Sequence, residues 1–167
     1  MSYRELYKPD EKPLAIMVPA WNETGVIGNM AELAATTLDY ENYHIFVGTY
    51  PNDPDTQRDV DEVCARFPNV HKVVCARPGP TSKADCLNNV LDAITQFERS
   101  ANFAFAGFIL HDAEDVISPM ELRLFNYLVE RKDLIQIPVY PFEREWTHFT
   151  SMTYICLLYT SPSPRDS

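Results

Sequence analysis

The sequence predicts an α/β fold, in which an open, mostly parallel sheet carries helices on both faces. Short apolar runs bounded by prolines or turn residues alternate with longer segments whose apolar residues recur at helical spacing. This alternation gives five strands and four helices. The 167 residues, of which 46% are hydrophobic and 23% charged, suit one globular domain with a sizeable core.

The first strand and the first helix follow one another closely. Residues 14–18 form a continuous apolar run between two prolines, which is typical of a strand buried on both faces. Residues 22–24 (Asn-Glu-Thr) offer helix-capping side chains, and apolar residues then recur at helical spacing over 26–38. Together these segments make the βα step of a parallel sheet.

The same step repeats in the next part of the chain. Residues 43–47 are strand-like and end in a loop at 48–55, after which an amphipathic helix is expected over 60–67. A third strand is expected at 70–76, and the Pro-Gly-Pro turn at 78–80 closes it.

The remaining elements complete the sheet. A clear helical stripe covers 82–98, and residues 104–110 form the most apolar strand, which we expect at the centre. A helix over 119–131, capped by Ser118, and a strand at 134–139 follow. In such sheets ligands bind outside the carboxyl ends of the strands, so the site is sought there.

The chain is acidic, with 24 acidic and 14 basic residues and a formal net charge of -10. This charge repels a phosphate backbone and excludes nucleic acid as a partner, whereas a small phosphorylated ligand can bind through a cation. The start lacks a signal peptide, and the apolar run at 101–110 is too short to cross a bilayer. We expect a soluble, cytoplasmic domain with buried thiols at Cys64, Cys75, Cys86 and Cys156.

Composition divides the chain into three segments. Residues 1–12 are a polar N-terminal segment, and residues 13–156 hold the predicted domain. Residues 157–167 are polar and rich in proline, and they resemble foreign coding sequence, such as a translated sequencing adapter. A native flexible tail is the alternative interpretation.

An acidic cluster at residues 111–115 directly follows the most apolar strand. In an extended segment the side chains at i and i+2 point the same way, so Asp112 and Glu114 can converge on one ion. Hard cations such as Mg²⁺ or Mn²⁺ prefer oxygen ligands and share them with substrate phosphates. The cluster therefore predicts a clamp for a metal and a diphosphate, and a solvated acidic turn is the alternative.

Two further segments lie at the same predicted edge. Lys83 falls in the first turn of a helix, where free N–H groups and the helix dipole favour anions. Residues 19–23 follow the first strand, where Trp21 could stack on a base or sugar and Asn22 or Glu23 could bind polar groups. The alternatives are a surface lysine and a helix start with a packed tryptophan.

In order and spacing, these segments resemble the family 2 glycosyltransferases. Residues 14–23 (LAIMVPAWNE) are similar to the family's VPAYNE segment, residues 83–88 (KADCLN) to KAxALN, and residues 111–115 (HDAED) to its D-x-D element. Residues 50–53 and 144–146 additionally resemble members like phage adsorption protein B, which are anchored in a membrane.

The resemblance implies a GT-A fold, a nucleotide-diphosphate sugar donor, a divalent Mg²⁺ or Mn²⁺ ion and inversion at the anomeric carbon. It implies that Asp112 and Glu114 hold the metal. The residues expected to bind the nucleotide sugar are Pro19, Trp21, Asn22, Glu23, Asp53, Lys83 and Asp112.

The sequence departs from the family pattern at two places. Family members usually carry an aspartate pair after the second strand, where this chain has Thr49 and Tyr50, and the nearest acid is Asp53. The family's general base comes from a later TED-like segment that this chain lacks, so we expect a domain truncated at its C-terminus and inactive alone.

Several properties remain open at this point. The acceptor is an unknown saccharide or lipid, and any contact with the inner membrane is expected only through other parts of a parent protein. A noncatalytic interaction module of the same fold is one alternative. A sugar nucleotidyltransferase is another, although residues 19–23 lack the glycine-rich phosphate loop expected of it.

Overall fold

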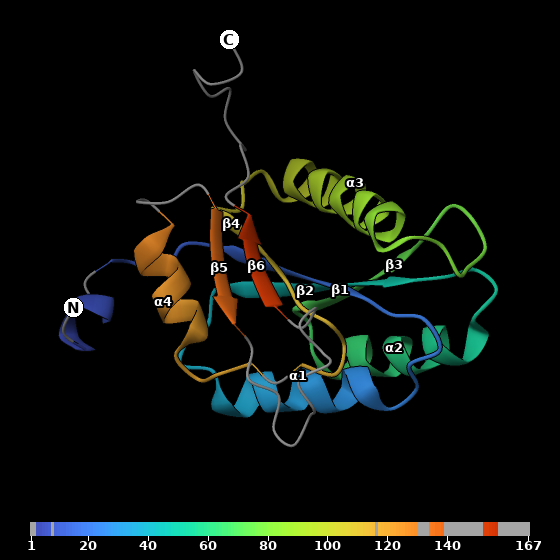
Figure 1. Ribbon diagram of the computed structural model, residues 1–167, viewed down its shortest axis with the longest axis horizontal. Helices are drawn as coiled ribbons and strands as arrows, with labels where there is room; N and C mark the ends of the chain where they lie inside the picture. The colour runs from blue at the N-terminus through green and yellow to red at the C-terminus, as the bar shows by residue number, and fades with distance from the viewer. Residues whose placement is uncertain (1–2, 8, 116, 130–133, 139–151, 157–167) are drawn as a thin grey trace, which may run out of the picture.

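The computed structural model describes residues 3–7, 9–115, 117–129, 134–138 and 152–156. It contains one six-stranded sheet in the order β3-β2-β1-β4-β6-β5 (Figure 1). The strands are β1 (Leu14–Pro19), β2 (Tyr43–Thr49), β3 (Val70–Val74), β4 (Gly107–Leu110), β5 (Leu134–Pro138) and β6 (Met152–Cys156). The helices are the 3₁₀ helix η1 (Tyr3–Tyr7) and the α-helices α1 (Val26–Thr37), α2 (Pro54–Arg66), α3 (Lys83–Ala101) and α4 (Glu121–Leu128).

The sheet is mostly parallel, as predicted. Strand β1 pairs in parallel with β2 and with β4, and β2 pairs in parallel with β3. Strand β4 is one of the two innermost strands, which confirms the expectation for the most apolar run. The sequence did not predict β6, which runs antiparallel to both β4 and β5. The predicted fifth strand therefore exists, but it lies at the edge and pairs only with an antiparallel neighbour.

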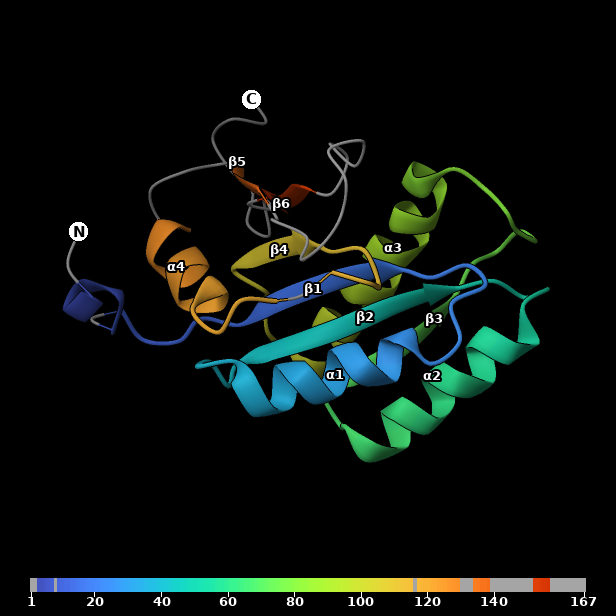
Figure 2. The ribbon, with the colours of Figure 1, turned by 60° about the horizontal axis from the view of Figure 1, so that its bottom comes forward.

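Helices cover both faces of the sheet, because successive side chains of a strand point to opposite faces. In β1, Leu14, Ile16 and Val18 pack into the core shared with α1, α2 and α4. Ala15 and Met17 face the other way, into the core beneath α3. Figure 2 shows α3 on one side of the sheet and α1 with α2 on the other. The α/β prediction with helices on both faces is confirmed.

The helix starts differ from the sequence predictions. Residues 22–24 do not cap α1: its N-cap is Gly25, which has a left-handed φ of 79° and makes no side-chain capping bond. Helix α2 begins at Pro54, within the segment 48–55 that is expected to be a loop, because its first turn is polar and precedes the apolar stripe. Helix α4 begins at Glu121 after Met120, so Ser118 is not its N-cap.

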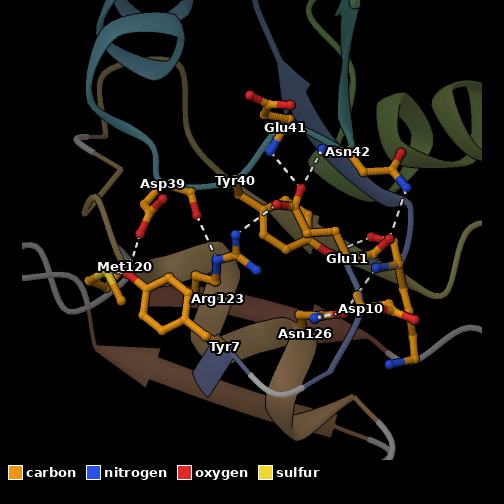
Figure 3. Close-up of polar contacts among 11 residues, drawn as sticks. Tyr7, Asp10, Glu11, Asp39, Tyr40, Glu41, Asn42, Met120, Arg123 and Asn126 are labelled. Atoms are coloured by element: carbon orange, nitrogen blue, oxygen red, sulfur yellow. Dashed lines mark hydrogen bonds and ion pairs between the residues drawn. The ribbon is translucent and has the colours of Figure 1, made fainter. Parts of the chain in front are cut away.

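Figure 3 shows that Tyr7, Asp10 and Glu11 of the N-terminal segment contact the rest of the domain. Leu6 of η1 is buried, and the guanidinium of Arg123 on α4 lies 4.8 Å from the ring centroid of Tyr7. Arg123 also donates hydrogen bonds to the Asp39 carbonyl oxygen at 2.9 Å and to Glu11 Oε2 at 2.7 Å. The polar N-terminal segment is thus joined to α4 and to the loop between α1 and β2.

A second set of contacts holds the same segment. The other carboxylate oxygen of Glu11 accepts hydrogen bonds from the backbone amides of Glu41 and Asn42, at 2.7 and 3.0 Å. Asn126 on α4 donates to the carbonyl oxygen of Asp10 at 2.9 Å and accepts from the amide of Lys12 at 3.1 Å. These backbone groups find partners only while residues 10–12 lie against the domain.

Some predictions fall outside the described residues. They are the last residues of the helix expected to reach 131, residue 139 of the predicted fifth strand, and the tail at 157–167. Within the described part of the chain, no helix combines the length and the apolar character needed to cross a membrane.

Candidate functional site

A cavity of about 300 Å³ lies at the carboxyl ends of the parallel strands. Segments that follow β1, β2 and β4 line it, together with the start of α3. The lining residues are Pro19, Ala20, Trp21, Glu23, Tyr50, Thr81, Lys83, Asp112, Ala113 and Glu114. Six of the residues predicted for nucleotide-sugar or metal binding therefore meet in one cavity, namely Pro19, Trp21, Glu23, Lys83, Asp112 and Glu114.

Two aromatic side chains form one wall of the cavity. Trp21 and Tyr50 meet edge to face, with ring centroids 5.3 Å apart and planes at 90°. Tyr50 is only 3% exposed, and its hydroxyl lies 2.8 Å from Thr81 Oγ1. Trp21 is 38% exposed, so a broad apolar surface remains open to a ligand. Such a surface can stack on a planar base or on the apolar face of a sugar.

Gly79 closes the back of this wall. The side chain of Asn52 holds it in both directions: Nδ2 donates to the Gly79 carbonyl at 2.8 Å, and Oδ1 accepts from its amide at 2.7 Å. A Cβ on Gly79 would lie 2.7 Å from the Trp21 ring and 2.8 Å from the Tyr50 ring. Glycine is needed here because the two rings leave no space for a side chain.

The polar wall carries an ion pair between two predicted site residues. Lys83, the first residue of α3, places Nζ 2.5 Å from Asp112 Oδ1. The Lys83 side chain is 48% exposed and the Asp112 side chain 28% exposed, so solvent reaches both groups. Ser82 caps α3 by accepting a hydrogen bond from the Asp85 amide, which fixes the helix start beside the cavity.

The acidic segment after β4 is a turn and not an extended strand, which corrects the geometry expected from the sequence. The Asp115 amide donates to the Asp112 carbonyl at 3.0 Å, and the Asp112 amide donates to Asp115 Oδ2 at 3.0 Å. Asp112 and Glu114 still line the same cavity. Asp115 turns toward the interior, so it holds the turn instead of facing a ligand.

His111 lies beneath this turn and is fully buried. Its Nε2 is 2.7 Å from Glu121 Oε2 at the start of α4, and its Nδ1 is 3.6 Å from Asp115 Oδ2. Burial alone would lower the pKa of His111, but the hydrogen bond to Glu121 and the negative charges of Glu121 and Asp115 raise the pKa to about 9. The protonated ring thus joins the acidic turn to α4.

Two predicted residues, Asn22 and Asp53, do not line the cavity. Asp53 caps α2 by accepting from the Thr56 amide, and its Oδ2 accepts from the Asn22 amide at 2.6 Å. Burial would raise the pKa of Asp53, but its hydrogen bonds with Thr56 and the Asn22 amide lower the pKa. Asn22 has a left-handed φ of 56°, which asparagine tolerates. Both residues shape the loop after β1, and a direct role in binding stays a prediction.

The described residues do not by themselves form a metal site. In this part of the chain, no group of three or more His, Cys, Asp or Glu side chains is arranged to hold one. Mg²⁺ often takes only one or two carboxylates from a protein and completes its shell with water and substrate phosphates. The pair of acids in the cavity fits that second arrangement.

Sequence reasoning missed several residues of the site. Tyr50 and Thr81 line the cavity, Gly79 and Asn52 support its wall, and the charge of His111 depends on Glu121. From the sequence, the Pro-Gly-Pro turn is predicted only to end a strand. The turn lies between β3 and α3 at the carboxyl edge of the sheet, and this position indicates that it could line a ligand cavity.

Comparison with known proteins gives a consistent assignment. A family model described as "Glycosyltransferase like family 2" matches residues 9–158. A mannosyltransferase from Pyrobaculum calidifontis, solved in complex with GDP-Man and Mn²⁺, superposes with a TM-score of 0.55 at 18% identity. It covers 75% of this chain, which spans 37% of that structure.

Two other solved structures share the fold. Residues 1–349 of S. aureus TarS give a TM-score of 0.56 at 13% identity, covering 73% of this chain and 34% of that one. A mycobacterial protein gives 0.53 at 14% identity, covering 80% of this chain and 42% of that one. The chain thus spans between about a third and two fifths of these structures, and at such identities the likeness concerns the fold. The narrower resemblance to phage adsorption protein B stays a prediction.

Proposed function

Because this chain belongs to the glycosyltransferase-like family 2, we propose that its cavity binds the nucleotide diphosphate of a sugar donor. The parent protein then transfers the sugar, with inversion, to a saccharide or lipid acceptor. The observation that carries the proposal is the composition of the cavity. It joins an aromatic wall, a helix-start lysine and three carboxylates at the carboxyl ends of parallel strands, where such folds bind ligands.

The two walls suit different parts of a donor. The exposed ring of Trp21, supported by the buried Tyr50, offers a stacking surface for the base. The hydroxyls of Tyr50 and Thr81 are 2.8 Å apart and can donate or accept hydrogen bonds at the edge of that surface. Lys83, which lines the same cavity, supplies a positive charge for a phosphate.

A divalent ion, Mg²⁺ or Mn²⁺, fits the acidic turn. Three lining side chains are carboxylates, Glu23, Asp112 and Glu114, and they would repel a diphosphate. When bound, the ion would neutralise charge on the leaving diphosphate. Asp112 and Glu114 would hold it, and the fold of the turn through Asp115 would keep Asp112 at the cavity.

The other parts of the reaction are proposed to lie elsewhere. A general base from a later segment of the parent protein would take the proton of the acceptor hydroxyl. We further propose that residues 13–156 form the donor-binding domain, that residues 157–167 are not part of it, and that the domain works in the cytoplasm. Attachment to the inner membrane would come from the rest of the parent protein.

The proposal is tested by calorimetry with uridine diphosphate and guanosine diphosphate as probes, with Mn²⁺ and with a chelator. The chain without substitutions, called the parent chain in these tests, should bind one of the two nucleotides weakly and only when Mn²⁺ is present. Asp112→Asn should weaken this binding at least tenfold, because it removes a charged ligand. Its melting temperature should change by only a few degrees, because the Lys83 pair that it loses is exposed.

Asp55→Asn is the matched control. Asp55 lies in the first turn of α2, and its ion pair with Arg58 is more than two-thirds exposed on both sides. The Asp55→Asn variant should show the same affinity as the unmutated chain for each of the two nucleotides. Equal affinity with cation and with chelator would contradict the metal-assisted site, and no nucleotide binding at all would favour the noncatalytic module.

A further inference from the structure

Lys83 and Asp112 both line the cavity, and they form an ion pair between elements far apart in the sequence. Lys83 starts α3 and Asp112 follows β4, and the contact between Nζ and Oδ1 measures 2.5 Å. The carboxylate that is proposed to hold a metal therefore already pairs with a protein cation through its Oδ1.

The ion pair between Lys83 and Asp112 matters because most of the charged side chains that line the cavity are negative. Among the residues that the structure describes, the lining contains three carboxylates, of Glu23, Asp112 and Glu114, and one ammonium, of Lys83. While Lys83 rests on Asp112, it offsets one of these negative charges but is not free to meet a phosphate. A divalent ion bound to the same oxygen would lie within a few ångströms of Nζ, where two positive charges repel strongly.

We infer that Lys83 is an exchangeable counter-ion, which competes with the metal for Asp112 and moves to the diphosphate when the metalled nucleotide binds. This inference rests on the proposed function and adds a coupling to it. The cation alone binds weakly because it must displace Lys83. The nucleotide removes that competition by giving the ammonium a phosphate partner.

The geometry allows such an exchange. Lys83 is nearly half exposed, and lysine carries its charge on a long, flexible stem, so Nζ can move without disturbing the helix start. The backbone of Asp112 stays fixed by its hydrogen bond to Asp115, so the carboxylate remains in place for the incoming ion. Coupling between two ligands is reciprocal, so Mn²⁺ must favour the nucleotide as much as the nucleotide favours Mn²⁺.

The test compares the parent chain with Lys83→Gln, and with Lys72→Gln as a matched control. Lys72 pairs with Asp61 at 2.8 Å, and neither residue lines the cavity. Mn²⁺ binding is measured alone by electron paramagnetic resonance, and uridine and guanosine diphosphate are then titrated at saturating Mn²⁺. Thermal melting checks that each variant is folded.

We expect Lys83→Gln to bind Mn²⁺ alone about two- to fivefold more tightly, the factor that an exposed ion pair supplies. The same variant should bind the nucleotide in Mn²⁺ at least tenfold more weakly, whereas Lys72→Gln should match the parent in both. Lys83→Arg, which keeps the charge, should retain weak binding of Mn²⁺ alone.

Two results would overturn the inference, and they differ. If Lys83→Gln weakens nucleotide binding but leaves Mn²⁺ affinity unchanged or lower, Lys83 binds phosphate without competing for Asp112, and the proposed function stands. If the parent binds neither nucleotide in Mn²⁺, the proposed function fails and the inference fails with it.

Discussion

Gly79 lies where the aromatic wall of the cavity leaves no room for a side chain, so alanine at this position perturbs the wall alone. The new Cβ would lie 2.7 Å from Cζ3 of Trp21 and 2.8 Å from Cδ1 of Tyr50. Tyr50 is buried and cannot move easily, whereas the more exposed Trp21 ring can swing outward. The free energy of unfolding should fall by only about 1 kcal/mol, the low end of the cost of overpacking.

Binding should suffer more than stability. Stacking of a base on an aromatic side chain is worth roughly 1–3 kcal/mol, so a displaced Trp21 ring should weaken nucleotide binding by about five- to 150-fold. The melting temperature of Gly79→Ala should fall by about 2–4 °C. Calorimetry with Mn²⁺ and either nucleoside diphosphate measures the first effect, and scanning calorimetry measures the second.

Gly28→Ala is the matched control. Gly28 lies inside α1, and a Cβ there would meet only Val63 Cγ2, at an ordinary contact distance of 3.6 Å. Alanine should leave binding unchanged and stabilise the helix by about 0.5–1 kcal/mol. If Gly79→Ala binds as the parent does while Trp21→Ala binds weakly, the wall tolerates the methyl group and the steric reasoning is wrong. If Trp21→Ala also binds normally, the ring is not part of the site.

Two further predictions concern stability. Burial and the charge of His44 lower the pKa of His71 to about 4. Below pH 6.5 the unfolded chain therefore binds a proton at His71, whereas the folded chain binds it only near pH 4. Stability should therefore fall by on the order of 1–3 kcal/mol as the pH drops from 6.5 to 4, and urea unfolding of His71→Phe should show a smaller fall. An unchanged pH profile would assign the acid sensitivity to other groups. Arg123→Met should lower the free energy of unfolding by about 2–4 kcal/mol in the same assay, because it removes two hydrogen bonds and leaves the Glu11 carboxylate without its cation. A loss below 1 kcal/mol would mean that the N-terminal segment contributes little to stability.

The strands were largely predictable, because a strand buried on both faces is a continuous apolar run. Strands β1, β2 and β4 appear in the sequence as such runs, and β4 proved to be an inner strand. Strand β6 was not predictable in this way, since antiparallel pairing with β4 and β5 depends on the path of the chain. The sequence did not predict the start of α1, because its N-cap is Gly25, which has a left-handed backbone and no capping side chain.

The candidate site was predictable to the extent that it follows from topology. Trp21, Lys83 and Asp112 follow different elements, and the rule for the carboxyl ends of parallel strands brought them together. The positions of the other site residues depend on loop conformation, which the sequence pattern does not predict. A role of Asp53 in nucleotide binding stays a prediction. Its carboxylate accepts hydrogen bonds from the amides of Asn22 and Thr56, contacts that depend on the fold of the loops after β1 and β2.

The order of the strands also has a consequence for how the cavity comes into being as the chain folds. Strands β1, β2 and β3 are joined by single helices, so their pairing brings together residues that are near in sequence. The pairing of β1 with β4 aligns Leu14 with Gly107 and must close a far longer loop, which costs more entropy and slows the step. Trp21 follows β1 and Asp112 follows β4, so the two residues meet only after these strands have paired. An intermediate that contains only the first three strands would have the aromatic wall but no acidic turn facing it, so nucleotide would select the fully closed sheet and slow its reopening.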